Sequence, residues 1–204
     1  MPYDHKRWLG RMRVLVLYAH PDRSSYGAAL HRETLDGLEA AGHTVDDCDL
    51  YAEGFDPVLN CRDRIGYYDT AYNRKPVESY VDRLEQASAL VIVSPVWTLG
   101  FPAILKGYFD RVWLPGVSFT LVDGRVRRKL TNIVKLGAVM TYGAPRMNAF
   151  LAGDPPRKLV TRLLRSQIKP MAPVNYVAHY DIDRSSSESR AQFLEKVKNS
   201  FAAF

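Results

Sequence analysis

The stretch VLVLYAHPDRSSYGAAL, residues Val14 to Leu30, contains a strand, a polar loop and the start of a helix. Its five leading apolar residues are typical of a strand that is buried on both faces of a sheet. The loop that follows holds a histidine, a proline, an aspartate, an arginine and two serines. A loop of this kind in front of a helix presents free backbone N–H groups and serine hydroxyl groups to an anion, which indicates a phosphate site. Ser24 or Ser25 fits a simple helix cap equally well, and the loop alone does not separate the two interpretations.

The rest of the chain extends this pattern of strand, loop and helix. Apolar runs predict strands at residues 13–19, 89–95, 132–141 and 172–180, and a run with a charged middle, residues 43–50, suits a sheet edge. Apolar stripes at helical spacing lie within residues 30–41, 104–113, 159–164 and 193–201. This alternation, with no repeat and no linker, predicts one α/β domain with a doubly wound, five-stranded parallel sheet and helices on both faces. We place the domain at residues 13–204 and treat residues 1–12 as an N-terminal extension.

Composition narrows the function classes. With 204 residues, 47% of them apolar and 25% charged, the chain suits a folded domain. The net charge of +6 favours anionic ligands, but only residues 125–129, RVRRK, form a basic cluster. We expect this cluster to be a solvated turn, and we expect no nucleic-acid partner. Cys48 and Cys61 have no metal-binding spacing, no apolar run could span a bilayer, and the basic first residues lack the apolar core of a signal peptide. We therefore expect reduced thiols in a cytoplasmic protein without membrane insertion.

Two more loops follow strands of the predicted sheet. Residues 94–102, SPVWTLGFP, combine two stiffening prolines, a glycine that allows close backbone approach, and the flat faces of Trp97 and Phe101. Residues 140–145, MTYGAP, end a strand in a hydroxyl, a glycine and a small residue. Because ligands of doubly wound sheets bind beyond the carboxyl ends of the strands, we expect the three loops to hold one planar ligand. A packed loop with a buried tryptophan is the alternative for residues 94–102.

Three segments carry a family resemblance. VLVLYAHPDRSSYGAAL, DLYAEGFDPVL and SPVWTLGFPAILKGYFDRVW together closely resemble the flavodoxin-like NAD(P)H:quinone oxidoreductases. That group includes mammalian quinone reductases, bacterial modulator-of-drug-activity proteins and potassium-efflux ancillary reductases. The resemblance implies a flavodoxin-like fold and a bound flavin, FAD or FMN. It implies ping-pong hydride transfer from NADH or NADPH through flavin N5 to a quinone or similar acceptor. It also implies a homodimer with the site at the interface, to which the tyrosine-rich residues 55–76 would contribute.

The resemblance assigns the flavin site residue by residue. The residues that match the family's phosphate loop are His20, Ser24, Tyr26 and Gly27. Those that match its isoalloxazine loop are Pro95, Val96, Trp97, Thr98 and Leu99. Those that match its pyrimidine-edge loop are Thr141, Tyr142, Gly143 and Ala144. The expected walls of the acceptor site are Trp97, Phe101 and Tyr142.

The choice between FAD and FMN depends on Arg190. It matches a family arginine that contacts the adenine half of FAD, and its alternative is a surface arginine paired with Glu188 or Glu195. Gly27 replaces a family asparagine that reaches the diphosphate, which counts against FAD. On balance we expect FAD, with FMN as the alternative.

Two departures from the family pattern limit the mechanism. The family's Thr-Thr-Gly-Gly run is TYGA here, and residues 146–156, RMNAFLAGDPP, lack the tyrosine and histidine that relay charge in the mammalian enzymes. We therefore assign the chemistry to the flavin and name no catalytic side chain. The alternatives are a regulatory subunit of a potassium-efflux-type transporter and a flavodoxin-type electron carrier.

Overall fold

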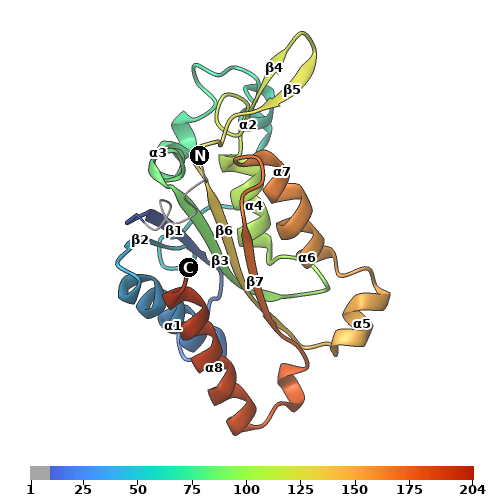
Figure 1. Cartoon of the computed structure of the whole chain (residues 1–204). Coiled ribbons are helices and arrows are strands. Elements are labelled where there is room, and N and C mark those ends of the chain that lie inside the picture. Colours follow the sequence, from blue (N-terminus) through green and yellow to red (C-terminus); the bar gives the residue numbers. More distant parts are fainter. Residues whose placement is uncertain (1–9) are drawn as a thin grey trace.

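The computed structural model describes residues 10–204 and shows a parallel sheet between two layers of helices (Figure 1). The five strands lie in the order β2-β1-β3-β6-β7, and all their pairings are parallel. This confirms the predicted fold class. Residues 1–9 of the expected N-terminal extension lie outside the described residues. Met12 already belongs to the fold, because its carbonyl oxygen accepts the Thr44 N–H at 2.9 Å.

The elements follow the predicted alternation. The sheet strands are β1 (Arg13–Tyr18), β2 (Thr44–Asp49), β3 (Ala89–Val96), β6 (Lys135–Tyr142) and β7 (Val174–His179). A separate hairpin consists of β4 (Phe119–Val122) and β5 (Arg125–Arg128). The long helices are α1 (Tyr26–Ala40), α3 (Glu78–Gln86), α4 (Ala103–Val112) and α8 (Ser187–Ala202). The short ones are α2 (Cys61–Ile65), α5 (Arg146–Leu151), α6 (Pro155–Lys158) and α7 (Arg165–Gln167). Single turns of 3₁₀ helix lie at Lys75–Val77 and Ile182–Arg184.

The two faces of the sheet have separate cores. In β1, Val14 and Val16 pack with α1 and α8, whereas Leu15 and Leu17 pack with α3 and α4. Successive side chains of a strand point to opposite faces, so an unbroken apolar run is what a sheet covered on both sides requires. Each fully buried side chain of this kind contributes about 1.5–3 kcal/mol to folding.

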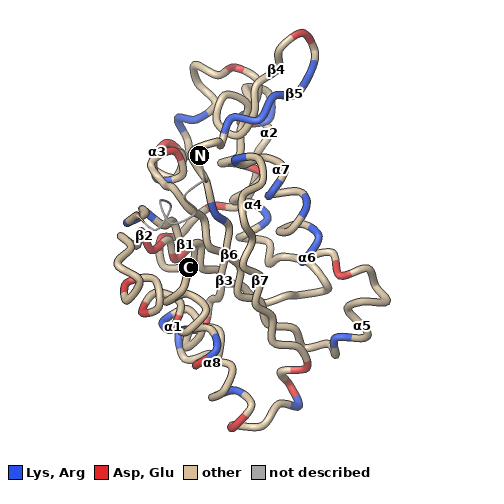
Figure 2. The backbone as a smooth tube through the Cα atoms, viewed as in Figure 1, with Lys and Arg blue, Asp and Glu red and all other residues tan. Residues whose placement is uncertain are grey.

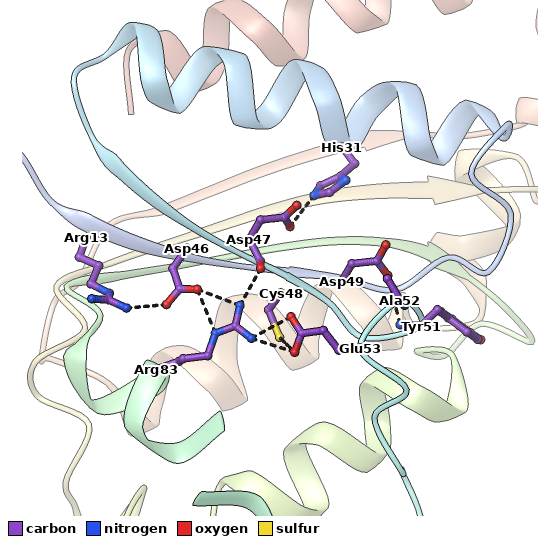
Figure 3. Close-up of polar contacts among 10 residues, drawn as sticks. All are labelled: Arg13, His31, Asp46, Asp47, Cys48, Asp49, Tyr51, Ala52, Glu53 and Arg83. Carbon is purple, nitrogen blue, oxygen red and sulfur yellow. Dashed lines mark hydrogen bonds and ion pairs between the residues drawn. The ribbon is translucent and has the colours of Figure 1, made fainter. Parts of the chain in front are cut away.

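Strand β2 lies at the sheet edge, as its charged sequence predicted (Figure 3). Asp46 accepts hydrogen bonds from Arg13 and Arg83, each at 2.9 Å, and Arg83 also donates to Glu53. Burial acts to raise the pKa of Asp46, but the two arginines outweigh it and hold this pKa below its usual value. The charges of β2 therefore have structural partners.

The β4–β5 hairpin was not predicted from the sequence. It projects from the end of the sheet where the strands begin, and Figure 2 shows its basic residues along one strand. All four residues of β5 are exposed, so the basic cluster is solvated as expected, but it forms a strand, and the turn lies before it at residues 123–124.

The third predicted helix is irregular. Residues Leu159–Leu164 form a π-helical segment between α6 and α7, and Leu163 is 50% exposed. Pro155 and Pro156 precede it and have no N–H group to donate within a helix. Among residues 10–204, no helix is long and apolar enough to cross a membrane.

Candidate functional site

The order of the strands creates the site. The chain proceeds from β1 to β2 on one side and then crosses to β3 on the other side of β1. The loops after β1 and β3 therefore separate at this point, and such a switch point is where doubly wound sheets bind ligands. Register places the third loop beside them, because Pro95 pairs with Thr141 and Val96 pairs with Tyr142. The structure thus brings the three predicted loops together at the end of the sheet where the strands finish.

In the β1–α1 loop the two serines have different roles. Ser25 is the N-cap of α1, since its hydroxyl accepts the Ala28 N–H at 3.1 Å. The Ser24 hydroxyl and backbone N–H both donate to the Asp22 carboxylate, at 2.7 and 2.8 Å. These hydrogen bonds lower the pKa of the fully exposed Asp22. Ser25, which the family resemblance did not single out, is therefore the serine at the helix N-terminus.

His20 organises the same loop. Its Nδ1 accepts the Asp22 N–H at 3.1 Å and lies 3.1 Å from the Ser25 hydroxyl. Its ring also contacts the edge of the Trp97 ring, with 6.0 Å between the ring centroids. His20 thus connects the β1–α1 loop to the loop after β3. The ring of His20 also lies close to Gly27, where an added Cβ would be 3.4 Å from it.

A second contact ties α1 to the C-terminal helix. The Tyr26 hydroxyl lies 2.9 Å from His179 Nδ1, and the Arg190 guanidinium stands 5.8 Å from the Tyr26 ring centre. Burial lowers the pKa of His179, and the nearby charges of Arg190 and Lys196 lower it further. This favours a neutral ring whose Nδ1 accepts a hydrogen bond from the Tyr26 hydroxyl. His179 was not predicted as a site residue, although a histidine at the end of a predicted strand was a signal for it.

Arg190 does not form the surface ion pair that was its alternative role. Its Nε donates to the Ser185 hydroxyl and its Nη2 donates to the Ile182 carbonyl oxygen, both at 2.9 Å. No ion pair joins it to Glu188 or Glu195 among residues 10–204. The side chain therefore stabilises the β7–α8 connection and lies beside the phosphate loop.

The β3–α4 loop contains a two-residue turn. Trp97 and Gly100 exchange both backbone hydrogen bonds, at 3.1 and 2.9 Å, around Thr98 and Leu99. These two residues have φ angles of 50° and 53°, in the left-handed region that is unfavourable for side chains with a Cβ. Trp97 is 43% exposed, so the interpretation of a buried tryptophan is wrong. Its ring remains free to face a ligand.

The remaining predicted residues of this loop are partly or wholly buried. Pro95 and Val96 belong to β3, and Val96 is 9% exposed. Phe101 is partly buried and stacks at a tilt on Phe109, 5.9 Å away. A Cβ at Gly100 would meet only the Trp97 and Thr98 carbonyl oxygens, at an ordinary 3.6 and 4.0 Å. The packing of the chain itself therefore does not require a glycine at position 100. A glycine there is consistent with a backbone that a ligand approaches closely.

At the end of β6, Tyr142 does not form the wall of the acceptor site that was predicted for it. Its side chain is completely buried, its hydroxyl donates to Asp154 at 2.8 Å, and it lies 2.6 Å from the Tyr176 hydroxyl. The ring also stacks on Tyr180 at 4.4 Å. A ring without exposed surface cannot form a wall of the acceptor site. Only the backbone of Tyr142 remains a candidate, and burial together with Tyr176 raises the pKa of its phenol.

The neighbours of Tyr142 in the β6–α5 loop lie close to the β7–α8 connection. A Cβ on Gly143 would approach the Asp183 carboxylate to 2.8 Å, and the Ala144 carbonyl accepts the Asp181 N–H at 3.1 Å. Thr141 is 6% exposed, and no hydrogen bond of its hydroxyl is found among residues 10–204. No sequence signal pointed to Asp154 or Asp183.

A narrow cleft lies where the three strands end, lined among others by Tyr18, Gly27, Ser94 and Thr141. It has no room of its own for a complete ligand, which needs a pocket of roughly 300–1,000 Å³, so it suits the border of a ligand that lies against the strand ends. A larger cavity, about 510 Å³, lies between the hairpin and α7. None of the predicted site residues lines it, so this cavity is separate from the three loops.

The residues present fit a phosphorylated flavin. The N-terminus of α1 offers N–H groups that lack partners within the helix. Beside them lie hydroxyl groups and the buried phenol of Tyr18, which has no hydrogen-bond partner among residues 10–204. The exposed Trp97 ring stands next to this end of the helix. An anion and a flat aromatic group are thus accommodated side by side.

Comparison with known proteins agrees with this geometry. A family model described as the flavodoxin-like fold matches residues 12–201. NAD(P)H dehydrogenase (quinone) 1 of Rattus norvegicus is 26% identical over 202 residues, which cover 90% of this chain and 74% of the rat protein. The chain spans about 55% of the length of several other curated relatives.

Two solved structures share the fold over nearly the whole chain. Smu.1420 from Streptococcus mutans UA159 is 27% identical, with a TM-score of 0.84 over 95% of this chain and 100% of the other. An NAD(P)H:quinone oxidoreductase from Methanothermobacter marburgensis is 23% identical, with a TM-score of 0.83 over 95% and 98%. The chain therefore belongs to the flavodoxin-like family, and its relatives there include NAD(P)H-dependent quinone reductases.

Proposed function

We propose that the protein is a cytoplasmic, flavin-dependent oxidoreductase that passes electrons from NADH or NADPH to a quinone or a similar flat electrophile. The observation that carries this proposal is the meeting of the three loops at the switch point, with His20 in contact with Trp97. The names of the relatives support the reaction class.

The chain's own groups would bind and orient the reactants. A bound flavin supplies hydride acceptance and donation, whereas the protein supplies position and electrostatics. The N-terminus of α1 would stabilise the charge of the flavin's phosphate, and the backbone of Thr141 to Ala144 would hold its pyrimidine edge. Trp97 forms one wall of an open face that donor and acceptor use in turn, which is the basis of a ping-pong cycle. Phe101 contributes the part of its ring that is not packed on Phe109.

We favour FAD over FMN because Arg190 lies beside the phosphate loop, at 5.8 Å from the Tyr26 ring. Two of its nitrogens are engaged by Ser185 and Ile182, and no hydrogen bond of Nη1 is found among residues 10–204. Denaturing the purified protein and chromatographing the released flavin decides between the two. Release of FMN alone would remove the proposed role of Arg190.

We also propose a homodimer. In the connection of residues 55–76, Ile65, Tyr68 and Tyr72 are 82%, 59% and 60% exposed. Apolar surface of this size in one segment is typical of a contact with another chain. Light scattering at working concentrations tests this, and a fully active monomer would contradict it.

The reaction itself is tested with the purified holoprotein. The expected result is a yellow protein that NADH or NADPH bleaches in the absence of oxygen and that an added quinone restores to yellow. A screen of quinones, nitro compounds and azo dyes with both nicotinamides would then identify the acceptor class. A protein that neither contains flavin nor binds it when added would overturn the proposal.

A further inference from the structure

The last residue of β1, Tyr18, holds a buried hydroxyl group that residues 10–204 leave without a hydrogen-bond partner. Tyr18 is 2% exposed, and its ring stacks on the ring of His31 with 4.1 Å between centroids and 2° between planes. Its hydroxyl oxygen is buried and has no hydrogen-bond partner of normal geometry among residues 10–204. Because an unpaired buried hydroxyl destabilises a fold, such a group needs an explanation.

The position of Tyr18 supplies one. Tyr18 lines the cleft at the strand ends together with Gly27, the second residue of α1, and Thr141. Ser25, the N-cap, also lies near its hydroxyl: burial raises the pKa of Tyr18, and Ser25 partly offsets this. A phenol donor and the positive end of a 15-residue helix are thus directed at the same small space.

The other buried polar side-chain atoms that lack a hydrogen-bond partner in residues 10–204 lie elsewhere. They are Arg74 Nε, Tyr108 Oη and Trp113 Nε1. Tyr108 belongs to α4 and packs on the opposite face of the sheet, in the core that contains Leu15 and Leu17. Tyr18 is therefore the member of this set that is placed at the ends of the strands.

We propose that the Tyr18 hydroxyl donates a hydrogen bond to a phosphate group of the flavin, as a binding residue beneath the β1–α1 loop. This inference rests on the proposed function. It adds a side chain that the family resemblance does not assign to the site. It also explains why a phenol occupies the end of a strand that is otherwise aliphatic, VLVL.

The test compares Tyr18→Phe with the matched variant Tyr108→Phe. Both substitutions remove a buried hydroxyl without a partner and keep the ring, so both ligand-free proteins should unfold at or above the wild-type temperature. Flavin affinity is then measured by fluorescence quenching with FMN, FAD and riboflavin, which has no phosphate. Tyr18→Phe should weaken FMN and FAD binding about tenfold, because a hydrogen bond to a charged group is lost. Riboflavin binding should not change, and Tyr108→Phe should bind all three as the wild type does.

Three results would overturn the inference. Unchanged FMN affinity in Tyr18→Phe would remove the role of Tyr18 and leave the proposed function standing. Equal weakening of riboflavin and FMN would mean that the substitution acts through packing and not through the phosphate. A wild-type protein that binds none of the three flavins would overturn the proposed function together with this inference.

Discussion

Replacement of Thr98 by asparagine should stabilise the ligand-free protein by roughly 1 kcal/mol. Thr98 and Leu99 are the central residues of a two-residue turn that requires positive φ at both positions, and such turns prefer asparagine and glycine. A left-handed backbone costs an L-residue about 1–2 kcal/mol, and it is least favourable for a β-branched one. Asparagine tolerates this conformation. The Thr98 side chain is exposed, so the substitution removes no core contact.

The assay is reversible unfolding of the ligand-free protein by urea or heat. For a domain of this size, 1 kcal/mol corresponds to an increase in Tm of about 2–4 °C. Thr98→Val is the control, because valine is also β-branched and should give no gain. We expect Thr98 to contribute its backbone groups and not its side chain to flavin binding, so Thr98→Asn should leave flavin affinity unchanged. Equal stability of the two variants, or a less stable Thr98→Asn protein, would refute the strain argument.

Three further substitutions test other parts of the structure. The depressed pKa of Asp46 implies stability that is present above its unfolded value of 3.8 and is lost as the pH falls through the folded value. Asp46→Asn should therefore lower the free energy of unfolding by about 1–3 kcal/mol near neutral pH. Below neutral pH the unfolding free energy of the variant should fall less steeply than that of the wild type as acid is added. An equally steep fall in both proteins would contradict this. Alanine normally stabilises a helix by about 1 kcal/mol relative to glycine, but Gly37→Ala should destabilise this protein, because the new Cβ would lie 2.6 Å from the Lys198 carbonyl oxygen. A higher urea midpoint in the variant would show that α8 moves to make room for the Cβ. Arg190→Ala should weaken FAD more than FMN in the same fluorescence titration, and equal losses would place Arg190 outside the adenylate site.

The sequence by itself determined the architecture. The apolar run of β1, its polar loop and the helical stripes predicted a doubly wound sheet and an edge position for β2, and both are confirmed. These features follow from local periodicity, because a strand places alternate side chains on opposite faces and a helix repeats every 3.6 residues. The same reasoning placed all three loops at one edge of the sheet, since the carboxyl ends of parallel strands lie together.

Only the tertiary structure decided which side chains face the site. Tyr142 turns into the core because Asp154 and Tyr176 satisfy its hydroxyl, and Tyr26 meets a histidine 153 residues away. The pattern of apolar and polar residues also contained no hint that Thr98 adopts positive φ or that the Tyr18 hydroxyl is buried without a partner. Such contacts join segments that are distant in the chain, so they depend on how helices and loops pack once the sheet has formed. Local periodicity carries information about faces and ends of elements, whereas the partner of a single polar atom is set by the three-dimensional packing around it.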